Sequence, residues 1–421
     1  MGSVSRRVCV VGQGYVGLPL AIASAKAGLP VVGFDIDEQR ITRLKNGESP
    51  IDDVSADVLR EVYNSGLYMP TSDEREISGC DVFVITVPTP LRNESPDTSA
   101  VAAAATTIAR YIEIGSLVIL ESTSYPGTTE EIVGTTITET RGLTGGRDYH
   151  LAFSPERIDP GNPLWNLCNT PKLVAGVDRA SRDAALDFYA NFVTQLIPVS
   201  DIREAEFAKL LENTFRQVNI ALVNELMIHA HRLGINFREV VRAAATKPFG
   251  FMSFVPGPGV GGHCLPIDPE YLSWKIGQET GRASDFITLA TQTNRTMPEY
   301  VVSRITDILI ARGRDVADAR ILVLGLSYKA NSRDARESPA VDVVRLGAAR
   351  GMSITVFDPI VEDPPADIAL VREVGELDLG MFDLGVLLTN HETLRTELLV
   401  RSLSCVLDTR YVLHGPNVVS L

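Results

Sequence analysis

The chain has 421 residues, of which 45% are hydrophobic and 22% are charged, a composition typical of globular proteins with a sizeable core. Lys and Arg number 39 and Asp and Glu number 53, so the formal net charge is −14 at pH 7. This charge disfavours nucleic acid or an anionic membrane as the main partner. An anionic small ligand is still compatible with a local basic pocket.

The cysteine pattern and the hydropathy argue against several further classes of protein. The five cysteines are widely spaced, with no C-x-x-C pair, so we expect neither a disulfide framework nor a metal site. This usage predicts a reducing, cytoplasmic location. No apolar run reaches about 18 residues, so we expect no membrane span. The N-terminal stretch "MGSVSRRVCVVGQG" enters a strand directly, which leaves no room for a signal peptide.

Strand-like runs alternate with helical stretches from residue 7 to about 195. The expected strands are "RVCVVG", "PVVGFDID", "DVFVITVP", "SLVILESTS", "HLAFSP" and "KLVAGV". The first is followed by a helical stretch, "LPLAIASAKAG", that ends at Gly28. This alternation predicts βαβ units and a mostly parallel sheet.

A long helical period follows, over residues 203–234. Its apolar stripe consists of Ala208, Leu211, Phe215, Val218, Leu222 and Leu226. Such a helix in mid-chain suits a spine between two α/β lobes, and it also suits a dimer interface. A second α/β pattern then begins at "ARILVLGLSYK" and continues through "SITVFDP", "LGVLLTN" and "CVLDTRYV". The predicted fold is therefore α/β, with two Rossmann-like doubly wound lobes joined by a helical region.

The stretch "VVGQGYVG" places Gly12, Gly14 and Gly17 in G-x-G-x-x-G spacing after a strand and before a helix. This arrangement is typical of a dinucleotide site, with the pyrophosphate on the helix N-terminus. Asp35 ends the next strand, where a carboxylate would hold the ribose hydroxyls. It favours NAD over NADP, because a carboxylate repels a 2′-phosphate, but the nearby Arg40 keeps NADP open.

Two further loops follow predicted strands, namely "TVPTP", which contains Pro88 and Thr89, and "ESTSYPGTTEE", which contains Thr123. Both should lie at the carboxyl edge of the sheet, where ligands bind. Thr123 could bond the cofactor or a substrate oxygen, and ordinary turn chemistry would explain it equally well.

The stretch "PGPGVGGHCLPIDP" raises the question of what Cys264 does after a run of glycines. A lone cysteine is most often a core residue. Here we expect the glycines to bring backbone N–H groups near the sulfur and to leave space around it, as a nucleophilic thiolate requires. Asp268 could move protons, whereas a structural role is favoured for His263.

Polar residues elsewhere could assist such a nucleophile. Lys209 and Asn213 lie four residues apart on the long helix and share a face. Together they could stabilise an oxyanion, although the spacing alone favours a solvated helix face. Glu156, beside Arg157 in "FSPERIDPGN", could activate water as a general base, or it could form a loop salt bridge.

Combined with a nicotinamide cofactor, these groups suggest a four-electron oxidation of an alcohol to a carboxylate. A thiolate would trap the aldehyde, and a second hydride transfer would leave a thioester for hydrolysis. Two rival classes remain: a single-step hydroxy-acid dehydrogenase that needs no cysteine, and a non-catalytic NAD-binding protein.

The chain resembles the UDP-glucose/GDP-mannose dehydrogenase family over nearly its whole length. The resemblance rests on "GQGYVGLPLA", "ESTSYPGTT", "SPERIDPGN", "AKLLENTFRQVNIALVNEL", "PGPGVGGHCLPIDP" and "LGLSYKANSRDARESP". It implies an NAD-binding domain over residues 1–197, a central helical dimerisation domain over 198–305, and a UDP-sugar-binding domain over 306–421. A homodimer that binds a UDP-sugar is thus expected.

The resemblance also implies roles for single residues. Cys264 would be the nucleophile, assisted by Lys209, Asn213, Asp268, Glu156 and Thr123. Cofactor contacts would come from Gly12, Gly14, Tyr15, Val16, Gly17, Asp35, Arg40, Pro88, Thr89, Thr123 and Arg336. Substrate contacts would come from Glu156, Arg157, Lys209, Asn213, Gly261, Lys329 and Arg410. "SPERIDPGN", "ATKPFGF" and "GGHCLPIDP" are most similar to the UDP-N-acetylhexosamine branch, with UDP-N-acetylglucosamine expected first, UDP-N-acetylmannosamine second and UDP-glucose third.

Overall fold

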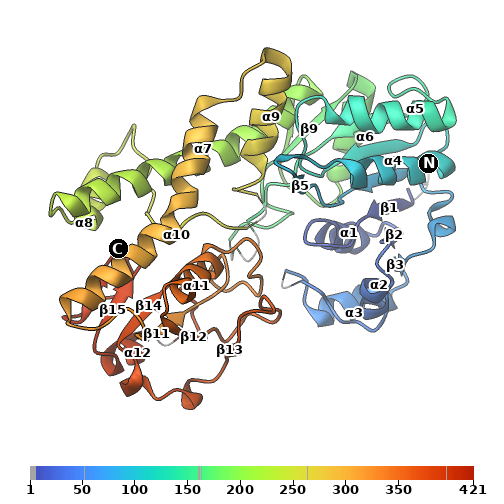
Figure 1. The fold of residues 1–421 in the computed structure, drawn as a ribbon. Helices are drawn as coiled ribbons and strands as arrows, with labels where there is room; N and C mark the ends of the chain where they lie inside the picture. Colours follow the sequence, from blue (N-terminus) through green and yellow to red (C-terminus); the bar gives the residue numbers. More distant parts are fainter. Residues whose placement is uncertain (1–5, 52, 160–161, 163, 263, 395) are drawn as a thin grey trace. The chain divides into compact units, whose positions relative to one another are not determined.

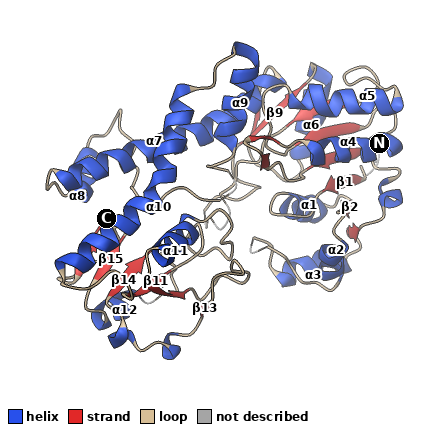
Figure 2. Cartoon of the chain, in the orientation of Figure 1, coloured by secondary structure: helices blue, strands red, loops and turns tan. Residues whose placement is uncertain are grey.

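The computed structural model describes residues 6–421 except 52, 160, 161, 163, 263 and 395. The chain packs as two compact units (Figure 1). The first comprises Met1–Glu212 and Glu270–Gly281, and the second comprises Asn213–Pro269 and Arg282–Leu421. Each unit contains one parallel or mostly parallel sheet with helices packed on it (Figure 2).

The sheet of the first unit has eight strands in the order β10-β9-β8-β7-β4-β1-β2-β3. Their bounds are β1 Val8–Val11, β2 Val31–Phe34, β3 Tyr68–Thr71, β4 Val82–Ile85, β7 Leu117–Leu120, β8 His150–Phe153, β9 Lys172–Gly176 and β10 Leu196–Pro198. All neighbours pair in parallel except β8 and β9. The run β3-β2-β1-β4-β7-β8 has the strand order of a dinucleotide-binding sheet.

Residues of β1 alternate between two hydrophobic clusters, one on each face of this sheet. Val8 and Val10 pack into one cluster, while Cys9 and Val11 pack into the other. Burial on both faces explains why the central strands are continuous apolar runs. The helices of this unit are α1 Gly17–Lys26, α2 Glu38–Lys45, α3 Ala56–Asn64, α4 Ser99–Tyr111, α5 Thr135–Arg141 and α6 Arg179–Tyr189, and a short hairpin joins β5 Leu91–Arg92 to β6 Ser95–Pro96.

The second unit repeats the same strand order with six parallel strands, β13-β12-β11-β14-β15-β16. Their bounds are β11 Arg320–Leu324, β12 Ser353–Phe357, β13 Leu370–Val371, β14 Leu384–Leu387, β15 Val406–Asp408 and β16 Val418–Ser420. Along β11, Ile321 and Val323 enter one cluster and Leu322 and Leu324 the other. Helices α11 Pro339–Ala349 and α12 Thr396–Ser402 belong to this unit.

The remaining helices are α7 Ile202–Arg232, α8 Phe237–Ala244, α9 Asp268–Thr280 and α10 Asp285–Ala311. Helix α7 is the predicted long helix; it ends before Gly234, whose φ of 71° suits a helix C-terminus. Both α7 and α9 contribute residues to the two units. The predicted fold class, two Rossmann-like domains joined by a helical region with a long spine helix, is confirmed.

Candidate active site

The glycines after β1 form a tight turn with one open position. A Cβ at Gly12 would lie 2.8 Å from the carbonyl oxygen of Thr86, and one at Gly17 would lie 1.8 Å from that of Gly12. Gly14, by contrast, has no described neighbour within 4 Å of such a Cβ. Helix α1 begins just after Val16, whose side chain makes no capping hydrogen bond. The backbone N–H groups at this helix N-terminus therefore suit the pyrophosphate of a dinucleotide.

Asp35 follows β2 and is 6% exposed. One carboxylate oxygen accepts hydrogen bonds from the backbone N–H of Gln13 and from Arg40 Nη1, both at 2.7 Å. The other accepts from the backbone N–H of Asp37 at 2.9 Å. Asp35 therefore lies against the glycine turn, as a ribose-binding carboxylate should, and it engages the Arg40 charge that would otherwise suit a 2′-phosphate.

The two predicted loops follow β4 and β7, at the carboxyl edge of the sheet. Pro88 is exposed, while Thr89 and Thr123 are partly buried. Glu206 of α7 anchors the loop that carries Thr123. Its carboxylate accepts hydrogen bonds from the backbone N–H groups of Gly127 (2.5 Å) and Thr129 (2.9 Å) and from the Thr129 hydroxyl (2.7 Å).

Glu206 is fully buried. Burial raises the pKa of its carboxyl to about 7, although these three hydrogen bonds act in the opposite direction. Glu206 lies one helical turn before Lys209, so the same part of α7 holds the Thr123 loop and carries the predicted catalytic lysine.

The polar residues predicted on α7 are buried. Lys209, Asn213 and Gln217 are 8%, 5% and 2% exposed, respectively, which rules out a solvated helix face. Asn213 Nδ2 donates a hydrogen bond to Asp268 Oδ2 at 2.5 Å, and Asp268 is 2% exposed. The structure therefore joins two of the predicted catalytic residues directly.

Cys264 is exposed, whereas Cys9, Cys80 and Cys405 are buried. Its carbonyl oxygen accepts a hydrogen bond from the backbone N–H of Asp268 at 2.9 Å. The cysteine thus lies one turn before α9, on the turn that leads to Asp268. Cys264 is therefore an accessible thiol just before the N-terminus of α9, and a helix N-terminus favours the thiolate form.

The glycines before Cys264 serve a different purpose from the expected one, because they permit close packing rather than leaving space. A Cβ at Gly261 would lie 2.5 Å from the carbonyl oxygen of Glu337, and one at Gly262 would lie 2.7 Å from the ring of Tyr328. At the start of this segment, the backbone N–H of Gly257 donates to Asn224 Oδ1 at 2.9 Å. His263 lies outside the described residues.

Glu156 and Arg157 occupy the loop after β8. Glu156 Oε1 accepts hydrogen bonds from the backbone N–H groups of Arg157 and Ile158, at 2.6 and 2.7 Å. The Arg157 guanidinium pairs with Glu212 of α7 at 2.5 Å and donates to the carbonyl oxygen of Pro171 at 2.7 Å. The loop is therefore attached to α7 through an ion pair.

The other predicted basic residues lie in the second unit. Lys329 is partly buried in the segment after β11, and Arg336 pairs with Asp334 at 2.8 Å. Arg410 follows β15 and donates to the carbonyl oxygen of Leu388. Burial lowers the pKa of its guanidinium to about 10, so Arg410 is still charged at neutral pH. A Cβ at Gly257 would lie 3.4 Å from Arg410 Nη1, which places this charge beside the glycine segment.

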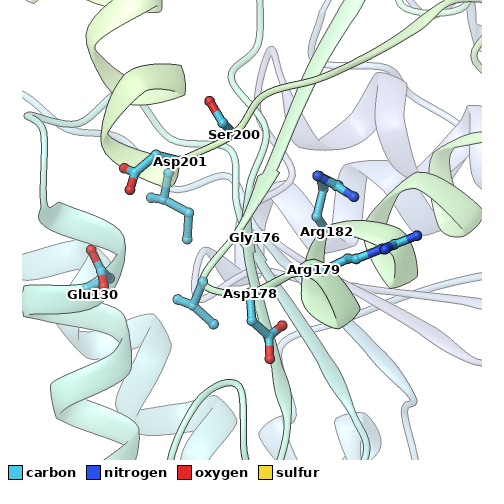
Figure 3. Close-up of a pocket in the computed structure, with 9 residues that line it drawn as sticks. Glu130, Gly176, Asp178, Arg179, Arg182, Ser200 and Asp201 are labelled. Atoms are coloured by element: carbon cyan, nitrogen blue, oxygen red, sulfur yellow. The ribbon is translucent and has the colours of Figure 1, made fainter.

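A cavity of about 200 Å³ lies at the opposite edge of the first sheet, where β9 ends at Gly176 (Figure 3). Arg179 and Arg182 extend to one side of it, and Glu130 and Asp201 lie on the other. Both arginines already pair with Asp183, at 3.4 and 2.9 Å. This cavity is separate from the loops at the carboxyl edge and is not part of the candidate active site.

Several supporting residues were not predicted from the sequence: Glu121, Lys172, Tyr189, Glu206, Glu212 and Asn224. Glu121 and Glu206 do lie within or beside motifs that were singled out, Glu121 at the start of "ESTSYPGTT" and Glu206 one turn before Lys209. Their burial, which depends on tertiary packing, distinguishes them from ordinary surface carboxylates.

Comparison with known proteins places these features in a family. Three domain models of the UDP-glucose/GDP-mannose dehydrogenase family match the chain. They are its NAD binding domain over residues 6–193, its central domain over 203–296 and its UDP binding domain over 322–417. The chain therefore belongs to this family of oxidoreductases and carries its NAD-binding domain.

Individual relatives cover nearly the whole chain. Identity is 37% to the UDP-N-acetyl-D-glucosamine 6-dehydrogenase of Pseudomonas aeruginosa, over 91% of this chain and 90% of the relative. It is 34% to the UDP-N-acetyl-D-mannosamine dehydrogenase of Pyrococcus horikoshii, over 98% and 97%. A solved structure of the UDP-D-ManNAc dehydrogenase from Pyrococcus horikoshii superposes with a TM-score of 0.89 at 32% identity, covering 98% of both chains.

Proposed function

We propose that this protein is an NAD-dependent UDP-N-acetylhexosamine 6-dehydrogenase that converts the C6 alcohol of the sugar into a carboxylate. The balanced reaction is RCH2OH + 2 NAD⁺ + H2O → RCOO⁻ + 2 NADH + 3 H⁺. The observation that carries the proposal is the exposed Cys264, one turn from Asp268, which accepts a hydrogen bond from buried Asn213. The named activities of the relatives support the substrate class.

The bound cofactor supplies a hydride acceptor, and one NAD⁺ is used for each of the two oxidations. Cys264 Sγ forms a bond to the aldehyde carbon produced by the first oxidation, which gives a thiohemiacetal. Loss of the second hydride from this carbon leaves a thioester on Cys264. Lys209 and Asn213 donate hydrogen bonds to the developing oxyanion, and such donors are most effective when they are buried and held in place.

Asp268 has two tasks in this scheme. Its hydrogen bond to one N–H of the Asn213 amide orients that side chain and leaves the second N–H for the substrate oxygen. Its carboxylate also accepts protons near Cys264.

Glu156 activates the water that hydrolyses the thioester. The water oxygen attacks the carbonyl carbon, Glu156 takes the proton, the C–S bond breaks, and the proton passes to the leaving thiolate.

Binding roles follow from position and charge. The cofactor is held by the glycine turn with Tyr15 and Val16, by Asp35 and Arg40, and by Pro88, Thr89, Thr123 and Arg336. The UDP-sugar is held by Glu156, Arg157, Lys209, Asn213, Gly261, Lys329 and Arg410. The charges of Lys329 and Arg410 suit a diphosphate and explain how a chain of net charge −14 binds one.

UDP-N-acetylglucosamine is the first choice of substrate. Arg157 supports an N-acetyl sugar because its guanidinium, held by Glu212 and Pro171, is a donor that could reach the N-acetyl carbonyl. The relatives include both gluco- and manno-specific enzymes, so UDP-N-acetylmannosamine and UDP-glucose belong in the same assay panel.

The test counts NADH formed per UDP-sugar consumed, in the wild type and in Cys264→Ala. We expect two NADH per sugar in the wild type, and NAD binding without acid formation in the variant. Cys168→Ala serves as the matched control, because Cys168 is a partly buried thiol in a loop of the first unit. One NADH per sugar would indicate a single-step dehydrogenase, and no turnover on any UDP-sugar would indicate a non-catalytic protein.

We further propose a cytoplasmic homodimer with three domains, over residues 1–197, 198–305 and 306–421. The three matched family domains support this division. Dimerisation is supported by α7, on which Leu211, Leu222 and Leu226 are 54%, 52% and 46% exposed. A second copy of the same helix offers a complementary apolar surface. No helix among the described residues has the length and apolar character to cross a membrane.

A further inference from the structure

We propose that Lys172 is a positioning residue for the thioester-hydrolysis step: it pairs with the Glu156 carboxylate and orients it, and Glu121 and Tyr189 hold Lys172. The inference deepens the proposed function and rests on it. Lys172, Glu121 and Tyr189 have no direct part in the reaction sequence above, and all lie within the first unit.

The geometry is a buried cluster built from three elements. Lys172 begins β9 and is 4% exposed; its Nζ lies 3.2 Å from Glu121 Oε1 and 3.7 Å from Glu156 Oε2. Glu121 follows β7 and its side chain has no exposed surface. Tyr189 is the last residue of α6, and its hydroxyl donates a hydrogen bond to Glu121 Oε1. The centre of its ring lies 4.9 Å from Lys172 Nζ.

The single Lys172 ammonium thus lies beside two carboxylates. Its one positive charge can neutralise only one of them. Burial raises the pKa of Glu121, against the opposing effect of Lys172, and the nearby Glu156 raises it further. Burial and Glu121 also raise the pKa of the Tyr189 hydroxyl, so this hydroxyl stays a neutral donor. A proton is therefore more readily held on Glu121, which leaves the Lys172 charge to stabilise the Glu156 carboxylate.

The two oxygens of Glu156 have different surroundings. Oε1 is occupied by two backbone N–H groups. Oε2 is buried and, among the described residues, has no hydrogen-bond partner; the same is true of Thr170 Oγ1. Glu156, Thr170 and Lys172 line a cavity of about 10 Å³, which is comparable with the space that one water molecule needs. Oε2 is thus the oxygen that faces both the ammonium and a place for water.

The charged neighbour of Glu156 in the loop is already paired. Arg157, its neighbour in the loop, is bound to Glu212 of α7 at 2.5 Å. Lys172 also lies 3.4 Å from the carbonyl oxygen of Pro155, which fixes the ammonium beside the loop. Lys172 is therefore a cation placed to pair with the Glu156 carboxylate and to orient it.

The test compares Lys172→Met and Lys172→Arg with the wild type in the presence of NAD⁺ and UDP-N-acetylglucosamine. In Lys172→Met we expect kcat to fall without a rise in KM for the UDP-sugar, because thioester hydrolysis is slowed after the substrate has bound. We also expect the Cys264 acyl adduct to accumulate in intact-mass spectra at neutral pH. Lys172→Arg should restore both. A matched control is Lys275→Met, because Lys275 also bridges two carboxylates, Glu131 at 3.1 Å and Glu279 at 3.2 Å, but not Glu156.

Lys172→Met leaves buried carboxylates without their cation, so it could fail to fold. The double variant Lys172→Met/Glu121→Gln removes one of these charges and retains an acceptor for Tyr189, and it carries the same expectation.

A wild-type kcat without accumulation of the acyl adduct in the folded double variant would overturn the inference. Failure of the proposed function gives a different result, since the wild type itself would then form no acid from any UDP-sugar.

Discussion

Asn213 and Asp268 form a direct hydrogen bond of 2.5 Å between the middle of α7 and the first residue of α9, and both side chains are buried. Since the backbone N–H of Asp268 also binds the Cys264 carbonyl oxygen, the position of the cysteine is tied to α7. Much of what we expect of the active site depends on this connection.

The first prediction concerns the strength of that bond. Asn213→Ala or Asp268→Ala should each lower the free energy of unfolding, because loss of one buried partner costs about 1–3 kcal/mol. A double-mutant cycle by urea denaturation should give a coupling energy of roughly 0.5–3 kcal/mol. Asn219→Ala, which removes a hydrogen bond to the Phe215 carbonyl oxygen on the same helix, is the control. Additive effects at positions 213 and 268 would contradict the direct bond.

The second prediction concerns Lys209. Replacement by Ala should lower kcat by roughly 10²-fold or more, which is the effect of losing an oxyanion donor. Arg203→Ala is the matched control, since Arg203 is a cation of the same helix that is 60% exposed and paired with Glu130. Steady-state rates of NADH formation measure both. A decrease of only two- or threefold at position 209 would remove the lysine from the mechanism.

The third prediction concerns pH and stability. Glu206 has a pKa of about 7 in the folded protein, against the ordinary value of 4.5 that a glutamate has in an unfolded chain. The folded state therefore binds more protons between these values, and stability falls as pH rises through this window. The decrease amounts to about 3 kcal/mol at 1.36 kcal/mol per pKa unit. Glu206→Gln should be less stable at low pH but should lose this part of the pH slope, as measured by urea denaturation from pH 4.5 to 8. An identical slope in both proteins would show that another group titrates.

The fourth prediction concerns assembly. The double substitution Leu222→Glu/Leu226→Glu should convert a dimer into a monomer in sedimentation velocity, because it places charges on the exposed apolar face of α7. Leu346→Glu is the control, since Leu346 is 37% exposed on α11. A wild-type monomer at micromolar concentration would argue against dimerisation through this face.

The sequence was most informative where strands are central in a sheet. Runs such as "RVCVVG" and "ARILVLG" predict β1 and β11 because both faces of these strands are buried. The strands β3, β10, β13 and β16 were not predicted. All four lie at sheet edges, where Pro70 of β3 is tolerated because one side of the strand needs no partner.

The environment of the proposed catalytic residues could not be predicted from the sequence. The motif resemblance predicts catalytic roles for Cys264, Asn213 and Asp268, whereas helical spacing alone favoured a solvated face for Lys209, which is buried. Burial of that face depends on contacts between distant parts of the chain, which residue spacing does not report. The purpose of Gly261 was missed for the same reason, because its close neighbour, the Glu337 carbonyl oxygen, lies far away in sequence.

Helix α7 buries amide side chains and a lysine on one side and exposes leucines on the other. A change in its number of residues should therefore be tolerated less well than the replacement of single residues. One inserted residue would rotate every later side chain by about 100° around the axis. Gln217 and Asn224 would then leave their buried positions, and Leu222 and Leu226 would turn away from the surface they now share. Insertions and deletions should therefore be rare across this helix, even where single substitutions are tolerated.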